Sequence, residues 1–240
     1  PLILTVALLP AIALLYYIWK KDKQKEPTSW LLKAVVGGAA ICIPVAILEM
    51  GISTVLFGED ANPTNVLGTT AMAFFDAALP EETFKLLVLW MVLRKNPYFD
   101  EHFDGIVYGV CVGLGFAAVE NVGYVMSDED NWVSVAIARS LLAVPAHYAF
   151  AVLMGYYYSI YHFVDHSPKV AVCVLLVPVV AHGIYDALAM SSMVNEYIGG
   201  VCSLVLIYFC VKMHKVALAK VLVLLHHDET DAGSAGNIRI

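Results

Sequence analysis

Charged residues are scarce in this sequence. Only 15% of its 240 residues are charged, whereas 60% are hydrophobic, and its mean hydropathy is +0.74. A soluble domain of this length needs far more polar surface, so the composition excludes one. The apolar residues gather in runs of about 20, the length that crosses the hydrocarbon core of a bilayer. The sequence therefore predicts an integral membrane protein.

Several signatures of known chemistry are also missing. The five cysteines lie inside apolar runs and show no CxxC spacing, which argues against a disulfide framework and against a thiolate metal site. The sequence contains no GxSxG and no HExxH motif, so neither a serine nucleophile nor a local zinc site is indicated. The net charge of −7 comes partly from loops and the tail, and it suggests no nucleic-acid partner.

Seven apolar segments are predicted to cross the membrane as helices. They cover residues 2–19, 31–57, 65–93, 104–127, 132–161, 169–190 and 197–212. An amphipathic helix at the interface is expected to continue to about residue 225. The predicted fold class is all-α, a polytopic transmembrane bundle that forms a single domain over residues 1–225. Residues 226–240 are polar and aperiodic, and we expect this tail to be disordered.

The loops between these segments differ in charge. Basic loops at one end of the segments alternate with acidic loops at the other: 20–25, 94–97, 166–169 and 212–215 are basic, and 58–60, 127–130 and 195–196 are acidic. Because basic loops stay in the cytoplasm, the N-terminus is predicted to lie outside and the C-terminus in the cytoplasm.

Ionisable residues nevertheless lie inside the predicted spans. They are Glu49, Asp76, Glu81, Glu82, Lys85, Glu120, Arg139 and Asp186. Each costs roughly 2.5–3.5 kcal/mol at the centre of a membrane helix, about 20 kcal/mol together. Such a cost is sustained only if the groups face one another or a water-filled cavity, which makes a functional site the default interpretation. A set of purely structural ion pairs is the alternative.

Five polar side chains are predicted to reach a similar depth. At about 1.5 Å per residue, Glu81, Glu82, Glu120, His147 and His182 all fall near the middle of the bilayer. They belong to four consecutive predicted helices. Polar residues with separate structural roles would be expected at different depths in the membrane. The shared depth therefore predicts one buried site.

Spacing within the helices adds detail to this site. Lys85 follows Glu81 by four residues and Glu82 by three, so it lies beside both carboxylates and can keep one of them ionised. Two adjacent carboxylates in a low-dielectric pocket are expected to supply one base and one acid. His182 and Asp186 are four residues apart, so the aspartate can fix the tautomer of the histidine or hydrogen-bond a reacting oxygen.

Other residues are expected to shape the surroundings. Arg139 is interpreted as balancing a carboxylate, and Asp76 as part of the cavity wall. Asn121 points about 100° away from the neighbouring Glu120 on a helix, so it is expected to bridge helices. Prolines 80 and 145 should kink their helices. Glycines at positions 105, 109 and 113 form a stripe that lets another helix pack closely.

Four segments resemble the motifs of one protein family. "EETFK" (81–85), "FDGIVYGVCVGLGFAAVEN" (103–121), "PAHYAF" (145–150) and "HGIYDAL" (182–188) are similar, in the same order, to motifs of the PrsW intramembrane proteases. That family is related to the CAAX prenyl proteases and, more remotely, to the APH-1 scaffold subunit of gamma-secretase. The resemblance covers residues 75–190, within a protease-like core of about 65–190. It implies a multi-pass endopeptidase in the cytoplasmic membrane of a prokaryote.

The resemblance also implies a substrate and a set of catalytic residues. The substrate is a membrane-anchored protein, in bacteria often a regulator such as an anti-sigma factor. The matching catalytic positions are Glu81, Glu82, Glu120, His147 and His182. The basic residue that follows the paired glutamates comes one position earlier than in the CAAX-type proteins, so a prenylated substrate is not expected.

The residues themselves favour an activated water as nucleophile, because no serine or cysteine has a basic neighbourhood in the sequence. In the preferred hypothesis no cofactor is needed. Glu81 or Glu82, with His147, deprotonates a water that attacks the peptide carbonyl, and His182 or Asp186 contributes to the oxyanion site and to proton return.

Two alternatives stay open. Zinc or another divalent cation can activate the water instead, held by His147, His182, Glu120 and Glu82, since ligands from different helices need no local motif. The chain can also be a non-catalytic membrane scaffold of the APH-1 type. A transporter would likewise place charged residues at this depth, but no inverted repeat is visible in the sequence.

Overall fold

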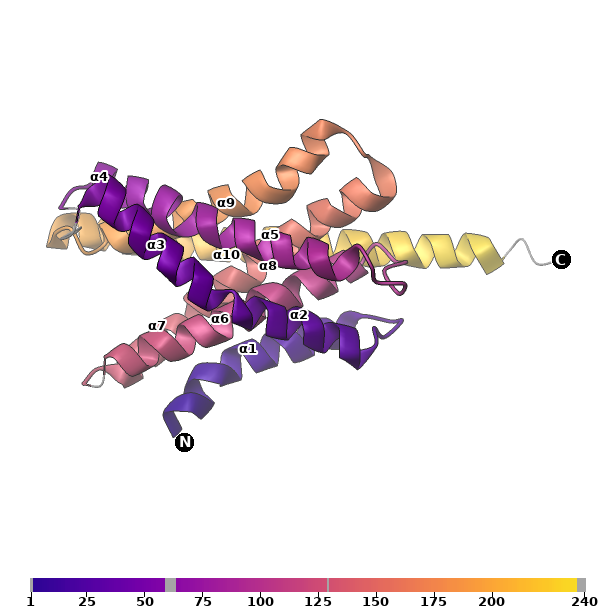
Figure 1. The fold of residues 1–240 in the computed structure, drawn as a ribbon, viewed down its shortest axis with the longest axis horizontal. Coiled ribbons are helices and arrows are strands. Elements are labelled where there is room, and N and C mark those ends of the chain that lie inside the picture. Colours follow the sequence, from indigo (N-terminus) through magenta and orange to yellow (C-terminus); the bar gives the residue numbers. More distant parts are fainter. Residues whose placement is uncertain (1, 59–63, 129, 237–240) are drawn as a thin grey trace.

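A computed structural model describes residues 2–58, 64–128 and 130–236 of the chain, and over these residues it is all-helical, without a strand (Figure 1). The helices are α1 (Leu2–Lys21), α2 (Thr28–Ala40), α3 (Cys42–Phe57), α4 (Val66–Met72), η1 (Ala73–Ala78), α5 (Leu79–Leu93), α6 (Asp104–Ser127), α7 (Trp132–Leu141), α8 (Ala143–Ser159), η2 (Ile160–Val164), α9 (Pro168–Ser191) and α10 (Glu196–Gly236). The segments η1 and η2 are π-helical. The all-α class predicted from the sequence is confirmed.

Six helical segments among the described residues are long and apolar enough to cross a membrane: Leu2–Lys21, Thr28–Phe57, Asp104–Ser127, Trp132–Val164, Pro168–Ser191 and Glu196–Asp231. The seventh predicted span, 65–93, folds as the uninterrupted helical run of α4, η1 and α5. This run is less apolar than the other six because it carries Asp76, Glu81, Glu82 and Lys85. Its crossing of the membrane, and the orientation of the termini, stay predictions.

Three of the predicted spans change geometry shortly before a proline. The span at 31–57 divides between α2 and α3 at Ile41, and the span at 132–161 divides between α7 and α8 at Leu142, where φ is −119° and ψ is −63°. Pro44 and Pro145 follow these points, and a proline has no N–H to bond the carbonyl four residues earlier. Pro80 follows the π-helical η1 in the same way.

The centre of the bundle is α6, whose glycine stripe packs against α8. A Cβ atom added to Gly105 would lie 2.8 Å from the carbonyl oxygen of Gly155, and one added to Gly109 would lie 2.9 Å from that of Ala151. A Cβ on Gly113 would lie 2.6 Å from the side chain of Ala151. The stripe therefore does what the sequence predicted, since it brings the backbones of two helices together.

Adding a methyl group where α6 and α8 pack closely should destabilise the protein. A Cβ on Gly155 would lie 2.2 Å from the carbonyl oxygen of Gly105, which is backbone and cannot turn aside. We expect Gly155→Ala to lower stability by about 1–3 kcal/mol, the usual cost of overpacking, and to lower the melting temperature of the detergent-solubilised protein. Gly123→Ala is the matched control, because a Cβ there meets no atom within 4 Å. Equal melting temperatures for the two variants would contradict this packing.

The tail predicted to be disordered from residue 226 is helical to Gly236, as the continuation of α10, while residues 237–240 lie outside the described part of the chain. Its fold follows from contacts that the sequence does not reveal. The Asp228 carboxylate accepts hydrogen bonds from the backbone N–H groups of His102 and Phe103, each at 2.9 Å, at the start of α6. Lys23 donates to Glu229 at 2.5 Å. These bonds hold the last turns of α10 against the rest of the bundle.

Candidate active site

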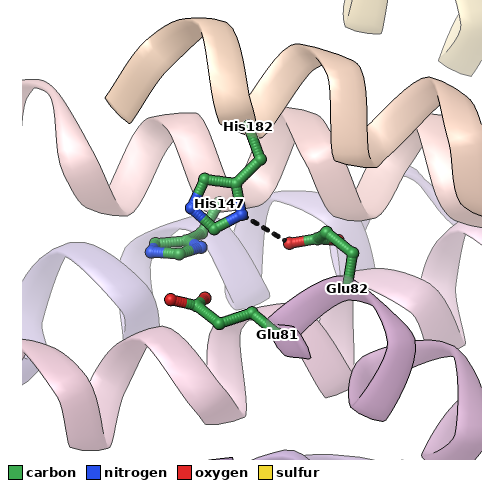
Figure 2. Close-up of side chains that lie close together, drawn as sticks. All are labelled: Glu81, Glu82, His147 and His182. Atoms are coloured by element: carbon green, nitrogen blue, oxygen red, sulfur yellow. Dashed lines mark hydrogen bonds and ion pairs between the residues drawn. The ribbon is translucent and has the colours of Figure 1, made fainter. Parts of the chain in front are cut away.

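Two carboxylates and two imidazoles meet in the interior of the bundle. Glu81 and Glu82 lie in the first turn of α5, His147 comes from α8 and His182 from α9, and one nitrogen or oxygen of each lies within 4.8 Å of the others. All four side chains are buried, and that of Glu82 is fully enclosed. Figure 2 shows both carboxylates turned toward the two rings. The convergence that the sequence predicted from depth is present in the structure.

Lys85 lies at the centre of this group. Its Nζ donates to Oε2 of Glu81 and to Oε1 of Glu82, both at 2.8 Å, and lies 3.3 Å from Nδ1 of His147. The lysine is 3% exposed, so these bonds form in a medium of low dielectric, where they are strong and where an unpaired charge is costly. The spacing of three and four residues thus produces the double ion pair that it predicted.

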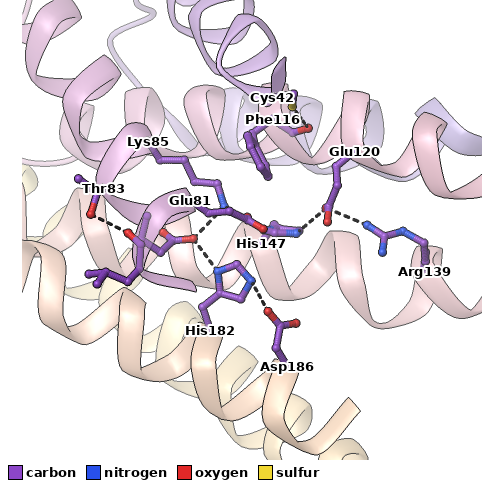
Figure 3. A network of polar contacts seen from close by, with 12 residues as sticks. Cys42, Glu81, Thr83, Lys85, Phe116, Glu120, Arg139, His147, His182 and Asp186 are labelled. Atoms are coloured by element: carbon purple, nitrogen blue, oxygen red, sulfur yellow. Dashed lines mark hydrogen bonds and ion pairs between the residues drawn. The ribbon is translucent and has the colours of Figure 1, made fainter. Parts of the chain in front are cut away.

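Each histidine is held by carboxylates. Nδ1 of His182 lies 2.9 Å from Oε1 of Glu82, and its Nε2 lies 3.0 Å from Oδ2 of Asp186. Nε2 of His147 lies 2.9 Å from Oε2 of Glu120, on α6. Figure 3 shows these contacts as a single network across four helices. In each ring Nε2 points away from the centre of the site and is bound to Glu120 or Asp186. Nδ1 of each ring therefore faces the interior of the site.

The outer end of the network is formed by Arg139 of α7. Its Nη2 donates to Oε2 of Glu120 at 2.8 Å, and its Nε donates to Oδ1 of Asn121 at 2.9 Å. Asn121 in turn donates to the carbonyl oxygen of Ala7 in α1, at 2.7 Å. The arginine therefore balances a carboxylate and the asparagine bridges helices, as both were expected to do. Together they fix the carboxylate that holds His147.

One predicted residue lies outside this network. Asp76 of η1 lines a separate hollow, together with Glu49 and Ser53 of α3, and makes no hydrogen bond to the four central residues. The sequence placed it in a cavity wall. The wall that it lines belongs to this separate hollow and not to the cluster of Glu81, Glu82, His147 and His182.

Two aromatic residues of the site were missed by reasoning from charge alone. The ring of Phe150 stacks on the imidazole of His182, with centroids 4.6 Å apart and an interplanar angle of 20°. The ring of Phe116 lies 4.2 Å from Nζ of Lys85. Both rings are buried and pack directly against the charged groups. Both residues lie inside the quoted motifs at 103–121 and 145–150, so the motifs contained this signal.

Comparison with known families decides the relationship. Residues 26–214 match the profile of the PrsW family intramembrane metalloproteases. The chain belongs to this family. The resemblance seen in its motifs is thereby confirmed, and it extends over most of the chain.

Curated relatives agree with this assignment. The chain is 34% identical over 185 residues to Protease PrsW of Oceanobacillus iheyensis, a match that covers 77% of the chain and 81% of the relative. It is 35% identical over 191 residues to Protease PrsW of Geobacillus kaustophilus, covering 79% and 80%. With Protease PrsW of Clostridioides difficile it shares 31% identity over 229 residues, covering 93% and 92%. No solved structure matches the chain.

Family membership and the six apolar helices together establish the class of protein. The chain is a multi-pass intramembrane protease of a bacterial cell membrane, and its substrates are therefore membrane proteins in a lipid bilayer.

Proposed function

We propose that this PrsW-family protease cuts a membrane-anchored protein with a water molecule activated by Glu81 and His147. The observation that carries the proposal is the convergence of Glu81, Glu82, His147 and His182 within 4.8 Å in the buried middle of the bundle. Such a cluster supplies a base, a proton donor and groups for an oxyanion, which peptide hydrolysis requires. A regulator of the anti-sigma factor type is the class of substrate that we favour.

The contacts of the two glutamates support different roles for them. Glu82 is fully enclosed, and its Oε1 faces both Lys85 and Nδ1 of His182, so its part is to position those groups. Glu81 is slightly exposed, and Lys85 bonds only its Oε2. The free oxygen of Glu81 is the better placed of the two to take a proton from water. We therefore assign the base to Glu81.

In the proposed reaction Glu81 takes one proton as the water oxygen bonds the peptide carbon. The negative charge that develops on the carbonyl oxygen is stabilised by the ammonium group of Lys85, which Glu82 holds in place, while Glu82 and Asp186 fix the ring of His182 beside it. The carboxylic acid of Glu81 then returns its proton to the peptide nitrogen as the carbon–nitrogen bond breaks. His147 orients the water, since its Nδ1 faces the interior while Glu120 holds its Nε2.

A divalent cation is the second candidate for activating the water, and the description of the family as metalloproteases favours it. The site fits such an ion in two respects. Both histidines have a carboxylate on the outer nitrogen, an arrangement common around zinc, and Oε2 of Glu82 is buried without a hydrogen-bond partner among the described residues. When bound, the ion would polarise the carbonyl and acidify the water.

The ligands for such an ion differ in one position from those expected from the sequence. The histidines and Glu82 belong to the cluster, but Glu81 takes the place of Glu120. Oε2 of Glu120 instead bonds Nε2 of His147 and accepts a hydrogen bond from Nη2 of Arg139. This correction follows from the direction in which α6 presents its side chain, which the sequence leaves open.

Lys85 argues for the metal-free mechanism. Its ammonium group already lies within 3.3 Å of Oε2 of Glu81, Oε1 of Glu82 and Nδ1 of His147, atoms that a metal ion would need as ligands. We therefore expect the purified protein to contain well under one zinc ion per chain and to keep its activity in the presence of a chelator. Elemental analysis at neutral pH checks this. Zinc bound one to one in the unaltered chain, and lost from His182→Asn, would show instead that the ion displaces the lysine.

We also propose that α4, η1 and α5 together form a seventh span, with the N-terminus outside and the C-terminus in the cytoplasm. Figure 1 shows this run extending along the bundle beside α9, as a crossing element would. We further propose the distant relation to the CAAX prenyl proteases and to APH-1, which rests on the order of the motifs.

Proteolysis itself can be tested in cells. We would compare the membrane proteins of cells that produce the unaltered chain with those of cells that produce its Glu81→Gln, Glu82→Gln double variant at the same level. We expect at least one single-span protein to be shortened only by the unaltered chain. Identical membrane proteomes under several stresses would favour the non-catalytic scaffold, whose function does not need these carboxylates.

A further inference from the structure

The charged network of the site is more open at one end than at its centre. The central side chains are at most 7% exposed; they are Glu81, Glu82, Lys85, His147 and His182. Those of Glu120, Arg139 and Asp186 are between 16% and 22% exposed. Figure 3 shows these three residues on one side of the two histidines, with Lys85 and Thr83 on the other. A peptide chain that reaches the buried centre has its least obstructed approach from this open end.

The three residues of the open end border one space, although they belong to three helices. Tyr124 lies one turn after Glu120 on α6 and is 52% exposed, and its ring centroid lies 3.9 Å from Cζ of Arg139 on α7. The charges of Glu120, Arg139 and Asp186 all reach the hydroxyl group of Tyr124. Asp186 of α9 therefore faces the same space as Arg139, with Tyr124 at its edge.

Two polar groups at this end have unused hydrogen-bonding capacity. Arg139 bonds Asn121 through Nε and Glu120 through Nη2, so its Nη1 has no partner among the described residues. Oδ2 of Asp186 bonds Nε2 of His182, whereas Oδ1 has no such partner. Neither atom is enclosed, so an occupant of the space can reach both.

The chemistry of these two groups selects the occupant. A donor and an acceptor without partners are costly inside a membrane protein. An extended peptide backbone offers a carbonyl oxygen to Nη1 of Arg139 and an N–H group to Oδ1 of Asp186. A lipid acyl chain offers neither, and in an intact helix most backbone groups are already bonded to one another.

We propose that the substrate chain enters the site at this open end, and that Arg139 and Asp186 bind its unwound backbone. The guanidinium group binds a peptide carbonyl oxygen, and the carboxylate binds a peptide N–H group. The same two side chains hold Glu120 and His182, so the contacts that receive the chain are joined directly to the catalytic network. This inference rests on the proposed function, because it names how that site takes its substrate.

Photochemical cross-linking can test the route without cleavage. The Glu81→Gln chain is made with benzoylphenylalanine in place of Tyr124 and is reconstituted in vesicles of phosphatidylethanolamine and phosphatidylglycerol. The probe is a biotin-labelled apolar peptide of about 20 residues, with a central Gly-Pro pair to break its helix. A second peptide, in which Ala-Leu replaces Gly-Pro, serves as the unbroken helix.

The matched control carries benzoylphenylalanine in place of Phe75. Phe75 of η1 is also an exposed aromatic residue, at 56%, and it lies six residues before Glu81, but it is not part of the charged network. We expect the broken peptide to be labelled at least fivefold more from position 124 than from position 75, and more than the unbroken peptide. Position 190, one turn after Asp186 on α9, provides a second site for the photoreactive residue and should behave like position 124.

A conservative substitution tests the contact with the backbone. In Arg139→Lys the ammonium group can still pair with Glu120, but the second guanidinium nitrogen is lost. We expect labelling of the broken peptide from position 124 to fall roughly tenfold, as for the loss of one hydrogen bond to a charged group. Arg94→Lys is the matched control, since Arg94 also lies over an aromatic ring, that of Trp90, and it should leave labelling unchanged. Yields are compared at equal amounts of folded protein.

Two results would overturn the proposal. Labelling from position 75 that equals or exceeds labelling from positions 124 and 190 would place the route elsewhere. Equal labelling in Arg139→Lys and Arg94→Lys would show that the arginine does not bind the chain. Because the chain used here does not cut, the labelling can succeed when the proteolysis experiment fails, and the two proposals are judged separately.

Discussion

Replacing Glu81 by glutamine is expected to lower the rate of peptide-bond hydrolysis by roughly 10²–10⁴-fold, the range that a positioned general base contributes. A glutamine amide cannot take a proton from water. Its carbonyl oxygen can still accept the hydrogen bond from Lys85 that Oε2 of Glu81 accepts at 2.8 Å, so the fold should be kept. The measurement is the rate of appearance of the shortened substrate with purified Glu81→Gln protein in vesicles, together with its melting temperature.

The neighbouring glutamate provides the sharpest comparison. Glu82→Gln should lower both activity and melting temperature, because Oε1 of Glu82 faces Lys85 and Nδ1 of His182 in a fully enclosed position. Glu196→Gln, at the exposed start of α10, should change neither. If Glu82→Gln alone abolished cleavage while the melting temperature stayed unchanged, the base would be Glu82 and our assignment of roles would be reversed.

Replacing Lys85 by methionine should have the largest effect on stability. Methionine fills a similar volume but leaves Glu81 and Glu82 without the ammonium group that bonds both. Removing one partner of a buried ion pair costs about 3–5 kcal/mol, because the remaining charge has no compensation. We expect a large fall in the melting temperature of the detergent-solubilised protein and a loss of proteolysis.

Two controls separate the ion pair from a general loss of packing. Lys33→Met removes an exposed lysine, whose Nζ lies 3.6 Å from the ring centroid of Trp30, and should change the melting temperature little. Adding Glu82→Gln to Lys85→Met removes one uncompensated charge and should recover part of the lost stability. If the double variant were no more stable than Lys85→Met, the lysine would contribute through packing and not through its charge.

The sequence alone determined the class of the protein and the four side chains that cluster at its centre. Runs of apolar residues must leave water, so they fix an all-helical membrane bundle whatever the details of packing. Charged residues inside those runs are too costly to be incidental, and for this reason Glu81, Glu82, His147 and His182 were recognisable before any fold was known. Spacing along a single helix, which involves no tertiary contact, correctly paired Lys85 with both glutamates.

Only the tertiary structure decided how the helices face one another. Helix rotation determined that Glu120 holds the outer nitrogen of His147, that Asp76 belongs to a separate hollow with Glu49, and that Phe116 and Phe150 enclose the charges. It also decided that α10 stays helical past residue 225, because Asp228 bonds the start of α6, more than a hundred residues away in the chain. Depth and spacing are local properties of one helix, whereas these contacts depend on the rotation and breaks of several helices at once.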